Sequence, residues 1–543
     1  MDSPKDTIQD YTFTCKGGLD NQNTYVELAE NTPGAALQLV NFEPSIYGGY
    51  RRINGFSPLN DSYTEVDSVN AEGKVLGVFI YQNEIYAARK QQSGTTYKIY
   101  RFDSGSGWVA QSPGFTLNTT DGTYTVTRVS YDTFSLSGTD MIIFADGVNY
   151  AYMFDGTTWT QIKSTNTGAD YANAGGNQVL DKPSLVEIYQ NHIFLSGDPT
   201  ASGVICHSSP SLEYDWLVAN GAGQIVAGFD INQIKVWRDF MYVFGLEDIG
   251  YVGVSSTNFV FKSVTTTVGC IAPFSVVETD GDLLYLSQGG FRTIAGTDKI
   301  NDVEINVVSK KVLGLTNTLT STYTSNDVVG YTIPSKSQVR FTWNLSTVST
   351  ADTRGVIGGI REDMMGNRSW EWGELLGIST YVATSGRVSG IEYVIHGDYS
   401  GNVFRQEIGN DFNGANIPAT YTTPHLDFGT PLHRKMLRDI FVFIRSEGTT
   451  DISYALSYNW DDKDKLVPPT EVIAGDERDT TQYGDGTQYG DVGATYGAGV
   501  YPLFAKSIRG TCQSVKISFT TSGMESPYTI QTIFIQYSGK GRR

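Results

Sequence analysis

The chain has 543 residues, and its 39 Lys and Arg against 58 Asp and Glu give a net charge of −19. A surface of this sign repels phosphate, which argues against a nucleic-acid-binding protein. Polar residues interrupt the apolar segments every few positions, and none approaches the roughly 20 residues of a membrane helix, so no membrane insertion is expected.

The composition favours β-structure. Gly 59, Tyr 33 and Phe 26 are high for this length, and only 18% of the residues are charged. Aromatic and β-branched residues suit strands and glycine suits turns, so the sequence predicts an all-β protein. Single cores usually stop growing at roughly 300 residues, and more than one domain, or a large repeat architecture with an appendage, is therefore expected.

Residues 1–60 are predicted to form an N-terminal arm and the strand that leads into the next domain. Charged residues precede any apolar run in the opening MDSPKDTIQDYTF, so no signal peptide is expected. Segment 41–56, NFEPSIYGGYRRINGF, has two interpretations. Gly48 and Gly49 can form a tight turn while Arg51 and Arg52 pair with acidic neighbours, or the arginines can grip phosphate.

Residues 61–415 contain a hairpin pattern that repeats about every fifty residues. Segments 80–86 (IYQNEIY) and 188–194 (IYQNHIF) match almost letter for letter as strand, polar turn and strand. The second strands of seven such hairpins centre on Ile85, Ile142, Ile193, Met241, Leu284, Val339 and Val394. Units of this length with about four short strands are typical of a β-propeller, here of about seven blades. A large β-sandwich, or several, would also space strands regularly.

Residues 416–543 are predicted to form a C-terminal β-sandwich. A continuous apolar strand, DIFVFI, spans 439–444, and further strands are expected at 452–458, 514–519 and 530–537. Between them lies 481–491, TQYGDGTQYGD, a tandem copy rich in glycine and tyrosine. Such a segment cannot build a core, so residues 476–500 are predicted to be a flexible loop.

Residues that bind metals or perform catalysis form no recognisable motif. The histidines are His192, His207, His396, His425 and His433, and no HExxH pattern occurs. They are interpreted as surface or turn residues, and Cys206 and His207, adjacent on a strand, must face opposite ways. The cysteines Cys15, Cys206, Cys270 and Cys512 are far apart in sequence and are interpreted as small core residues, not disulfides.

Two acidic segments, Asp280–Asp282 and Asn459–Asp464, have oxygen ligands for Ca²⁺ but lack EF-hand spacing, and hairpin turns are the favoured interpretation. Segment 154–159, FDGTTW, lacks one residue of a sialidase-type box and is interpreted as a blade turn. No GxSxG, P-loop or Rossmann fingerprint is present. The sequence therefore predicts no catalytic, metal or cofactor-binding residue, no cofactor, and a protein that is not an enzyme.

Three N-terminal motifs carry a family resemblance: KGGLD (16–20), NFEP (41–44) and GGYRRINGF (48–56). They resemble the opening of the packaged-DNA stabilisation or tail hub proteins of short-tailed phages. WRDF (237–240) and LRDI (437–440) are similar to the middle and end of that family. The specific match covers about a tenth of the chain, and the Tyr/Gly-rich loop departs from the family.

The resemblance implies a structural virion protein of a phage tail, a tail hub, nozzle or head-to-tail connector, made in the host cytoplasm. Its subunits would form a homo-oligomeric ring, commonly a hexamer, that extends the DNA channel and helps retain and eject the genome. Portal or adaptor proteins and tail fibres or spikes would be its partners, and genomic DNA would pass an acidic wall without specific binding. Under this interpretation Arg51 and Arg52 make ion pairs. The alternatives are a receptor- or glycan-binding propeller of a tail spike or fibre base, and a propeller hydrolase.

Overall fold

The computed structural model describes residues 8–24, 27–28, 34–45, 48–60, 73–91, 94–136, 138–163, 179–255, 258–295, 307–322, 327–343, 353–362, 368–475 and 503–539. In these ranges the chain is nearly all β-structure, as predicted. The helical elements named there are α3 (Leu313–Thr322) and the short turns η1 (Val218–Asn220), η2 (Pro273–Ser275), η3 (Lys310–Val312) and η5 (Pro334–Lys336). No helix in the described part is long and apolar enough to cross a membrane. The predicted loop 476–500 lies outside the described residues.

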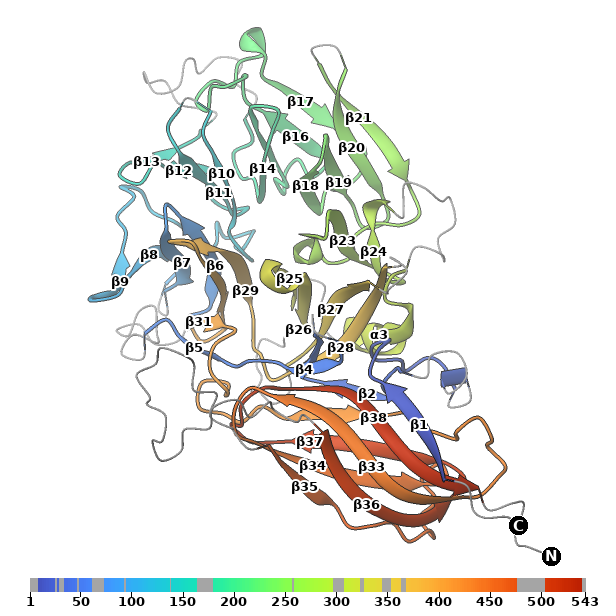
Figure 1. Cartoon of the computed structure of the whole chain (residues 1–543). Coiled ribbons are helices and arrows are strands. Elements are labelled where there is room, and N and C mark those ends of the chain that lie inside the picture. Colours follow the sequence, from blue (N-terminus) through green and yellow to red (C-terminus); the bar gives the residue numbers. More distant parts are fainter. Residues whose placement is uncertain are drawn as a thin grey trace, which may run out of the picture.

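Within the described chain, six separate antiparallel sheets are arranged as the blades of a β-propeller (Figure 1). Three of them are β6 (Val75–Tyr81), β7 (Glu84–Lys90), β8 (Tyr97–Asp103), β9 (Gly107–Ala110); β10 (Ser130–Phe134), β11 (Met141–Ala145), β12 (Tyr152–Phe154), β13 (Trp159–Gln161); and β14 (Leu185–Tyr189), β15 (His192–Ser196), β16 (Val204–His207), β17 (Gly223–Val226). The others are β18 (Gln233–Trp237), β19 (Phe240–Phe244), β20 (Ile249–Ser255), β21 (Asn258–Thr265); β22 (Val277–Thr279), β23 (Asp282–Ser287), β24 (Gly290–Thr293); and β29 (Val382–Val388), β30 (Ile391–Gly397), β31 (Val403–Gln406), β5 (Phe56–Pro58).

The predicted count of about seven blades is corrected to six, because the remaining repeat unit belongs to a larger sheet. Its strands β25 (Val328–Ile333), β26 (Gln338–Trp343), β27 (Arg354–Glu362) and β28 (Arg368–Leu376) begin a nine-stranded sheet. That sheet continues through β2 (Gln38–Val40), β32 (Ala419–Thr422), β37 (Val515–Thr521), β34 (Thr450–Tyr458) and β35 (Glu471–Gly475). The unit is joined edge to edge to the C-terminal strands, while β25 packs against β22 and β29 of the ring.

The repeated hairpins follow from their turn residues. Gln82 and Asn83 have φ angles of 48° and 62°, and Gln190 and Asn191 have 49° and 60°. Two consecutive left-handed residues form the tight turn whose twist matches antiparallel strands, and asparagine tolerates this conformation better than most residues. This geometry explains why the same QN pair occurs in both segments.

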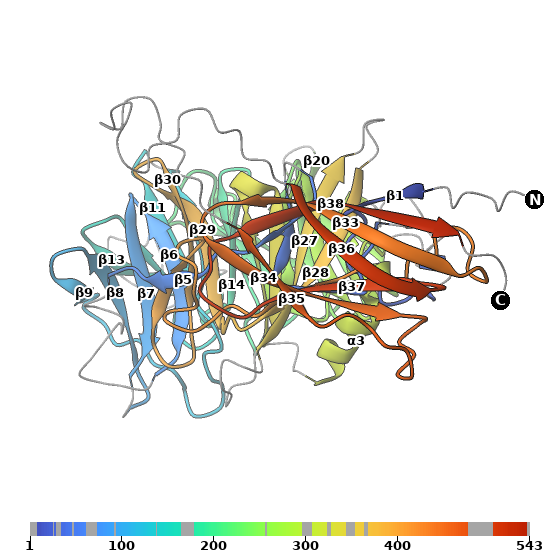
Figure 2. The same ribbon diagram turned by 60° about the horizontal axis from the view of Figure 1, so that its bottom comes forward.

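A further sheet packs beside the nine-stranded one. Its strands are β3 (Phe42–Pro44), β4 (Tyr50–Arg52), β38 (Tyr528–Gly539), β33 (Lys435–Ser446) and β36 (Leu503–Cys512), and β1 (Ile8–Thr14) pairs with β38. Residues in β34 alternate between buried and less buried positions, as expected of a sheet with one face in a core. Ile440 and Ile535 of this sheet share one buried cluster with Leu456 and Ile517 of the other. Figure 2 shows these C-terminal strands in front of the blades.

The N-terminal 60 residues hold both parts together. Strands β1, β3 and β4 join the sheet of β33 and β38, β2 bridges β28 and β32, and β5 is the last strand of the blade β29–β31. One blade of the propeller and the C-terminal sheets are thus connected by backbone hydrogen bonds from a single segment. All four cysteines are buried and free, as predicted.

Candidate functional site

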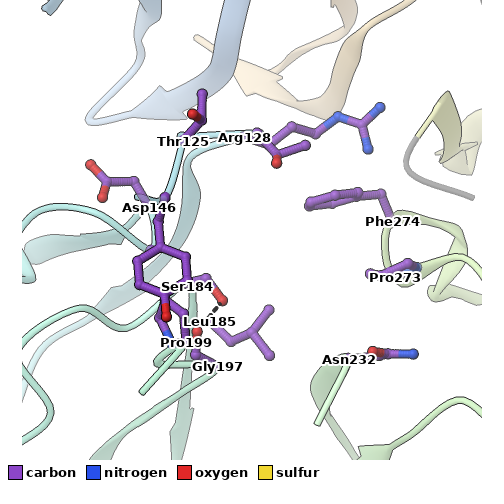
Figure 3. A pocket seen from close by; sticks show the side chains of 13 residues that line it. Thr125, Arg128, Asp146, Ser184, Leu185, Gly197, Pro199, Asn232, Pro273 and Phe274 are labelled. Carbon is purple, nitrogen blue, oxygen red and sulfur yellow. Dashed lines mark hydrogen bonds between the residues drawn. The ribbon is translucent and has the colours of Figure 1, made fainter. Parts of the chain in front are cut away.

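The first strands of the repeat units surround the axis of the propeller. Residues of β6, β10, β14, β18, β22, β25 and β29 line a cavity of about 600 Å³ there. A smaller hollow of about 240 Å³ lies at the ends of neighbouring strands and shares two residues, Arg128 and Phe274, with the larger cavity. Figure 3 shows this smaller hollow, with Arg128 and Phe274 on one side of it and Asp146 across from them.

Arg128 and Phe274 lie where the two hollows meet. The Arg128 guanidinium carbon is 4.1 Å from the centre of the Phe274 ring and 4.7 Å from that of Tyr381. Its Nε donates a hydrogen bond of 2.8 Å to the carbonyl oxygen of Tyr381. Burial lowers the pKa of Arg128 to about 10, so the side chain stays charged at neutral pH. A cation held between two aromatic faces fixes this boundary.

The polar groups of the smaller hollow are occupied by the protein itself. Asp146 accepts hydrogen bonds from the backbone of Val148 at 2.9 Å and of Asn149 at 2.8 Å, and from the Tyr97 hydroxyl at 2.5 Å. Ser184 donates to the carbonyl of Gly197 at 2.8 Å. These bonds stabilise turns between strands, and we interpret the smaller hollow as structural.

The larger cavity contains a line of three charged side chains, Asp132 on β10, Glu187 on β14 and Lys235 on β18. Asp132 Oδ2 accepts the backbone N–H of Ile188 at 2.9 Å. Glu187 Oε2 accepts that of Val236 at 3.4 Å, and its other oxygen pairs with Lys235 Nζ. Each carboxylate is therefore held by the backbone of the next unit around the ring.

Burial raises the pKa of Glu187 to about 7, and Asp132 adds to this increase while Lys235 opposes it. For Lys235, burial favours the neutral amine, but the two carboxylates outweigh it and the pKa is raised. The Lys235 side chain is 37% exposed and the Glu187 side chain is 9% exposed. Burial also raises the pKa of Asp132.

This arrangement can exchange protons and bind hydroxyl groups. A carboxyl group with a pKa near neutrality can donate or accept a hydrogen bond, and an adjacent ammonium group is a fixed donor. Strongly perturbed groups in a cavity are typical of functional sites. We therefore take Asp132, Glu187 and Lys235 as the candidate functional site.

Sequence reasoning missed all three of these residues. Their signal is a single charge inside an otherwise apolar first strand, as in LVEIY (185–189) and QIKVW (233–237), repeated in successive units. A charged residue in such a position is unexpected for a strand buried in a core. Its repetition in successive units indicates that these first strands line the axis of the ring.

The interpretation of the histidines as surface or turn residues is wrong for four of them. His192, His207, His396 and His425 are buried, and His433 is exposed. The rings of His192 and His207 are 5.2 Å apart, and Phe259 packs against both. Burial lowers the pKa of both histidines.

The side chains of Cys206 and His207 face opposite ways, as predicted. Cys206 lies in a buried hydrophobic cluster, whereas the His207 ring packs against Phe259. In the ranges that the structure describes, no group of three or more His, Cys, Asp or Glu side chains is placed to hold a metal ion. The absence of catalytic and cofactor-binding residues stays a prediction.

The acidic segments form turns. Asp280 and Gly281, with φ angles of 49° and 74°, connect β22 to β23, and Asn459, Trp460 and Asp461 turn the chain after β34. Segment 154–159 is the predicted blade turn between β12 and β13.

The GGYRR segment forms the hairpin of β3 and β4, with Gly48 and Gly49 in its turn at φ angles of 83° and 80°. Arg51 pairs with Glu43 at 2.9 Å and with Glu447 at 2.6 Å, as predicted. The prediction of an ion pair for Arg52 is wrong.

Arg52 is fully buried and donates to backbone carbonyl oxygens, including that of Gly523 at 2.8 Å and that of Ile417 at 3.3 Å. Burial lowers its pKa. Arg52 therefore binds backbone carbonyl oxygens where acidic side chains were expected. In this arrangement the guanidinium groups of both arginines bind protein groups, so neither is positioned to bind phosphate.

No family model matches the sequence, and no curated protein matches it. Among the solved structures that resemble the fold is an ancestral GH74 enzyme, at 12% identity and a TM-score of 0.40, over 68% of this chain and 50% of that one. Another is a glycoside hydrolase family 43 arabinoxylan arabinofuranohydrolase from Bacillus subtilis, at 11% identity and a TM-score of 0.24, over 89% and 100%. A third is the extracellular domain of a one-component system from B. thetaiotaomicron, at 10% identity and a TM-score of 0.36, over 65% and 40%. The chain spans half the length of the first and less of the third.

The prediction that the chain is not an enzyme is contradicted by this comparison, because two of these proteins are glycoside hydrolases. In general, a ring of blades can bring catalytic groups together from separate strands, so the lack of a local sequence motif does not exclude an enzyme. At this level of identity the likeness concerns the fold and assigns no activity.

Proposed function

We propose that the chain is a structural subunit of the tail of a tailed bacteriophage, a tail hub, nozzle or head-to-tail connector. The observation that supports the proposal is the position of the GGYRR segment, one of the stretches that carry the family resemblance. It forms the junction at which the N-terminal hairpin, the C-terminal sheets and the propeller meet. A family motif that builds the joint between two parts is expected to accompany the whole two-part architecture.

Three contacts define this junction. A Cβ atom on Gly49 would lie 2.1 Å from the carbonyl oxygen of Ile530 in β38, so only glycine allows the close approach. Arg51 connects the hairpin to Glu447, and Arg52 connects it to the loop at Gly523. The hairpin therefore fixes how the C-terminal sheets are attached.

The same contacts favour two finer structural proposals. The sheets of β33 and β34 act as a C-terminal β-sandwich, since their inward faces share one core. Strands β25–β28 act as the link between the six blades and that sandwich. A rigid unit of this kind presents blade edges on one side and the sandwich on the other, which suits a subunit that contacts two neighbours in a ring.

In the assembled tail, the subunits would form a homo-oligomeric ring, commonly sixfold, between portal or adaptor proteins and fibres or spikes. The net charge of −19 supports a channel wall past which DNA slides, because a like-charged lining raises the energy of every bound position. The protein would be found in the virion and would help to retain and eject the genome.

This proposal can be tested on virus particles produced from the genome that encodes the chain. Antibodies raised against the recombinant protein should label the tail, and tails released from the particles should show a closed ring of the chain by negative-stain microscopy and native mass spectrometry. A trimer in the released tail would support the spike-base alternative instead. If the antibodies label no part of the particle, both the tail-subunit proposal and the spike-base alternative are wrong.

A further inference from the structure

We propose that the wide cavity on the propeller axis is a binding site for a neutral carbohydrate, held by Asp132, Glu187 and Lys235. This inference goes beyond the proposed role in a tail and does not depend on it. It concerns the single subunit, whose cavity is complete without a second copy.

The three side chains are fixed before any ligand arrives. Backbone N–H groups of Ile188 and Val236 hold the two carboxylates, and Glu187 holds the Lys235 ammonium. Polar groups that are already oriented lose little conformational entropy on binding. The cavity of about 600 Å³ lies within the range of about 300–1,000 Å³ that is usual for small-molecule sites, and it is large enough for a disaccharide.

The cavity also carries hydroxyl groups. The Tyr131 hydroxyl lies 2.7 Å from Thr384 Oγ1, and the Thr332 and Ser385 hydroxyls are 3.4 Å apart. All four residues line the cavity. A ligand in the cavity would meet both the charged groups and hydroxyls that can donate and accept hydrogen bonds.

The charges of the cavity disfavour other classes of ligand. A metal ion would lie beside the Lys235 ammonium, which repels it. An anion would face Asp132, Glu187 and Glu278, and the nearby Arg128 already binds Tyr381 and Phe274. An apolar ligand would leave the three charges without solvent.

A neutral sugar fits the charges of the cavity, because each of its hydroxyl groups can donate a hydrogen bond to a carboxylate or accept one from an ammonium group. Glu187 suits either role, since burial raises its pKa to about 7. Two carboxylates and one ammonium group can thus bind adjacent hydroxyls without a net change of charge in the cavity.

A purely structural role is the competing explanation, in which the line of charges only joins neighbouring units. The chain offers a matched control for it. Lys182 Nζ pairs with Asp121 Oδ2 at 2.5 Å between loops of neighbouring units, and neither residue lines the cavity. If both pairs were only structural, removing either lysine would have the same kind of effect.

The experiment uses the full chain at pH 7, with cellobiose, maltose, lactose and chitobiose as probes. Saturation-transfer NMR detects binding, and isothermal titration calorimetry measures it. Wild-type protein is expected to bind at least one of the four saturably. The Glu187→Gln and Lys235→Met variants should weaken that binding at least tenfold, while Lys182→Met leaves it unchanged. Thermal unfolding of each variant confirms that it is folded.

The near-isosteric Asp132→Asn variant provides a second measurement if Lys235→Met fails to fold, and it too should weaken binding at least tenfold. Saturable binding to none of the four sugars overturns the inference, as does binding that both Glu187→Gln and Asp132→Asn leave intact. Neither result affects ring formation in the tail, so failure of this inference and failure of the proposed function are separate observations.

Discussion

Arg340 and Glu43 form an ion pair in the interior of the protein, with 3.2 Å between Nη2 and Oε2 and exposed fractions of 0% and 2% for the two side chains. Arg340 lies on β26 and Glu43 on β3, so the pair joins the repeat unit β25–β28 to the N-terminal hairpin. Lys336 and Arg51 also contact Glu43, and Glu407 contacts Arg340. A single carboxylate is therefore surrounded by three cations at the junction of the two parts.

Replacing Glu43 by Gln should destabilise the protein by about 3–5 kcal/mol, because three cations at the junction lose their shared buried carboxylate and keep only Glu407 and Glu447. Chemical denaturation followed by intrinsic fluorescence measures the change. The control is Glu362→Gln, which removes a surface pair with Arg368 whose side chains are 54% and 64% exposed. That substitution should change stability by no more than about 1 kcal/mol. Equal effects of the two would show that the cluster contributes no more than a surface pair.

The unfolding free energy should fall in two ranges of pH on acidification. Burial, aided by Arg340, lowers the pKa of His396 to about 3 from its ordinary 6.5. The unfolded chain therefore binds this proton first, and stability decreases from about pH 6.5 down to about 3, by at most about 1.4 kcal/mol per pH unit for this group. Urea titrations at a series of pH values measure the slope, and His396→Gln should reduce it.

A second loss belongs to Glu43. Burial favours its neutral form, but Lys336, Arg340 and Arg51 outweigh burial and lower its pKa to about 2 from 4.5. A lowered carboxyl pKa gives stability that is present above about pH 4.5 and is lost as the pH falls toward 2. In Glu43→Gln this lower range should show a smaller decrease. An unchanged decrease would assign the acid transition to other groups.

The sequence predicted the repeat well because local rules decide it. Each of the seven predicted second-strand centres, from Ile85 to Val394, lies in the second strand of its hairpin. Ile85 and Ile193 each pair with an isoleucine across the same left-handed turn. Turn chemistry and alternating apolar residues act over a few positions, so they can be read from the chain directly.

Long-range pairing could not be predicted in the same way. Val40 pairs in parallel with Glu374, and Phe56 pairs with Gln406, across more than three hundred residues. No local pattern marks such partners, and the edge of β28 therefore gave no sign that it continues into the C-terminal strands. The three residues of the candidate site come together in a similar way, since Asp132 and Glu187 belong to neighbouring units and meet only when the first strands of those units pack side by side.

The equivalence of repeat positions predicts the effect of a core charge. Ile193 is the second residue of β15 and is fully buried, as Met241 is in β19. Ile193→Asp places an unpaired carboxylate in the core and should destabilise the protein by more than about 4 kcal/mol. Circular dichroism and solubility report the loss of the native fold.

Ile391 provides the matched control for this substitution. It lies at the start of β30 and is 57% exposed, so Ile391→Asp should leave the fold intact. A soluble, native-like Ile193→Asp protein would contradict the alignment of the units.

The two glycines of the N-terminal hairpin should differ sharply in their tolerance of alanine. Gly48 and Gly49 have nearly equal φ angles, 83° and 80°, so the backbone strain of an L-residue is the same for both, on the order of 1–2 kcal/mol. A Cβ atom on Gly48 would meet nothing within 4 Å, whereas one on Gly49 would lie 2.1 Å from the Ile530 carbonyl oxygen. Gly49→Ala must therefore also separate β4 from β38. Thermal unfolding should show a small decrease in Tm for Gly48→Ala and a much larger one for Gly49→Ala. Equal decreases would mean that strain alone sets the requirement for glycine, and that the hairpin does not depend on its close contact with the C-terminal sheet.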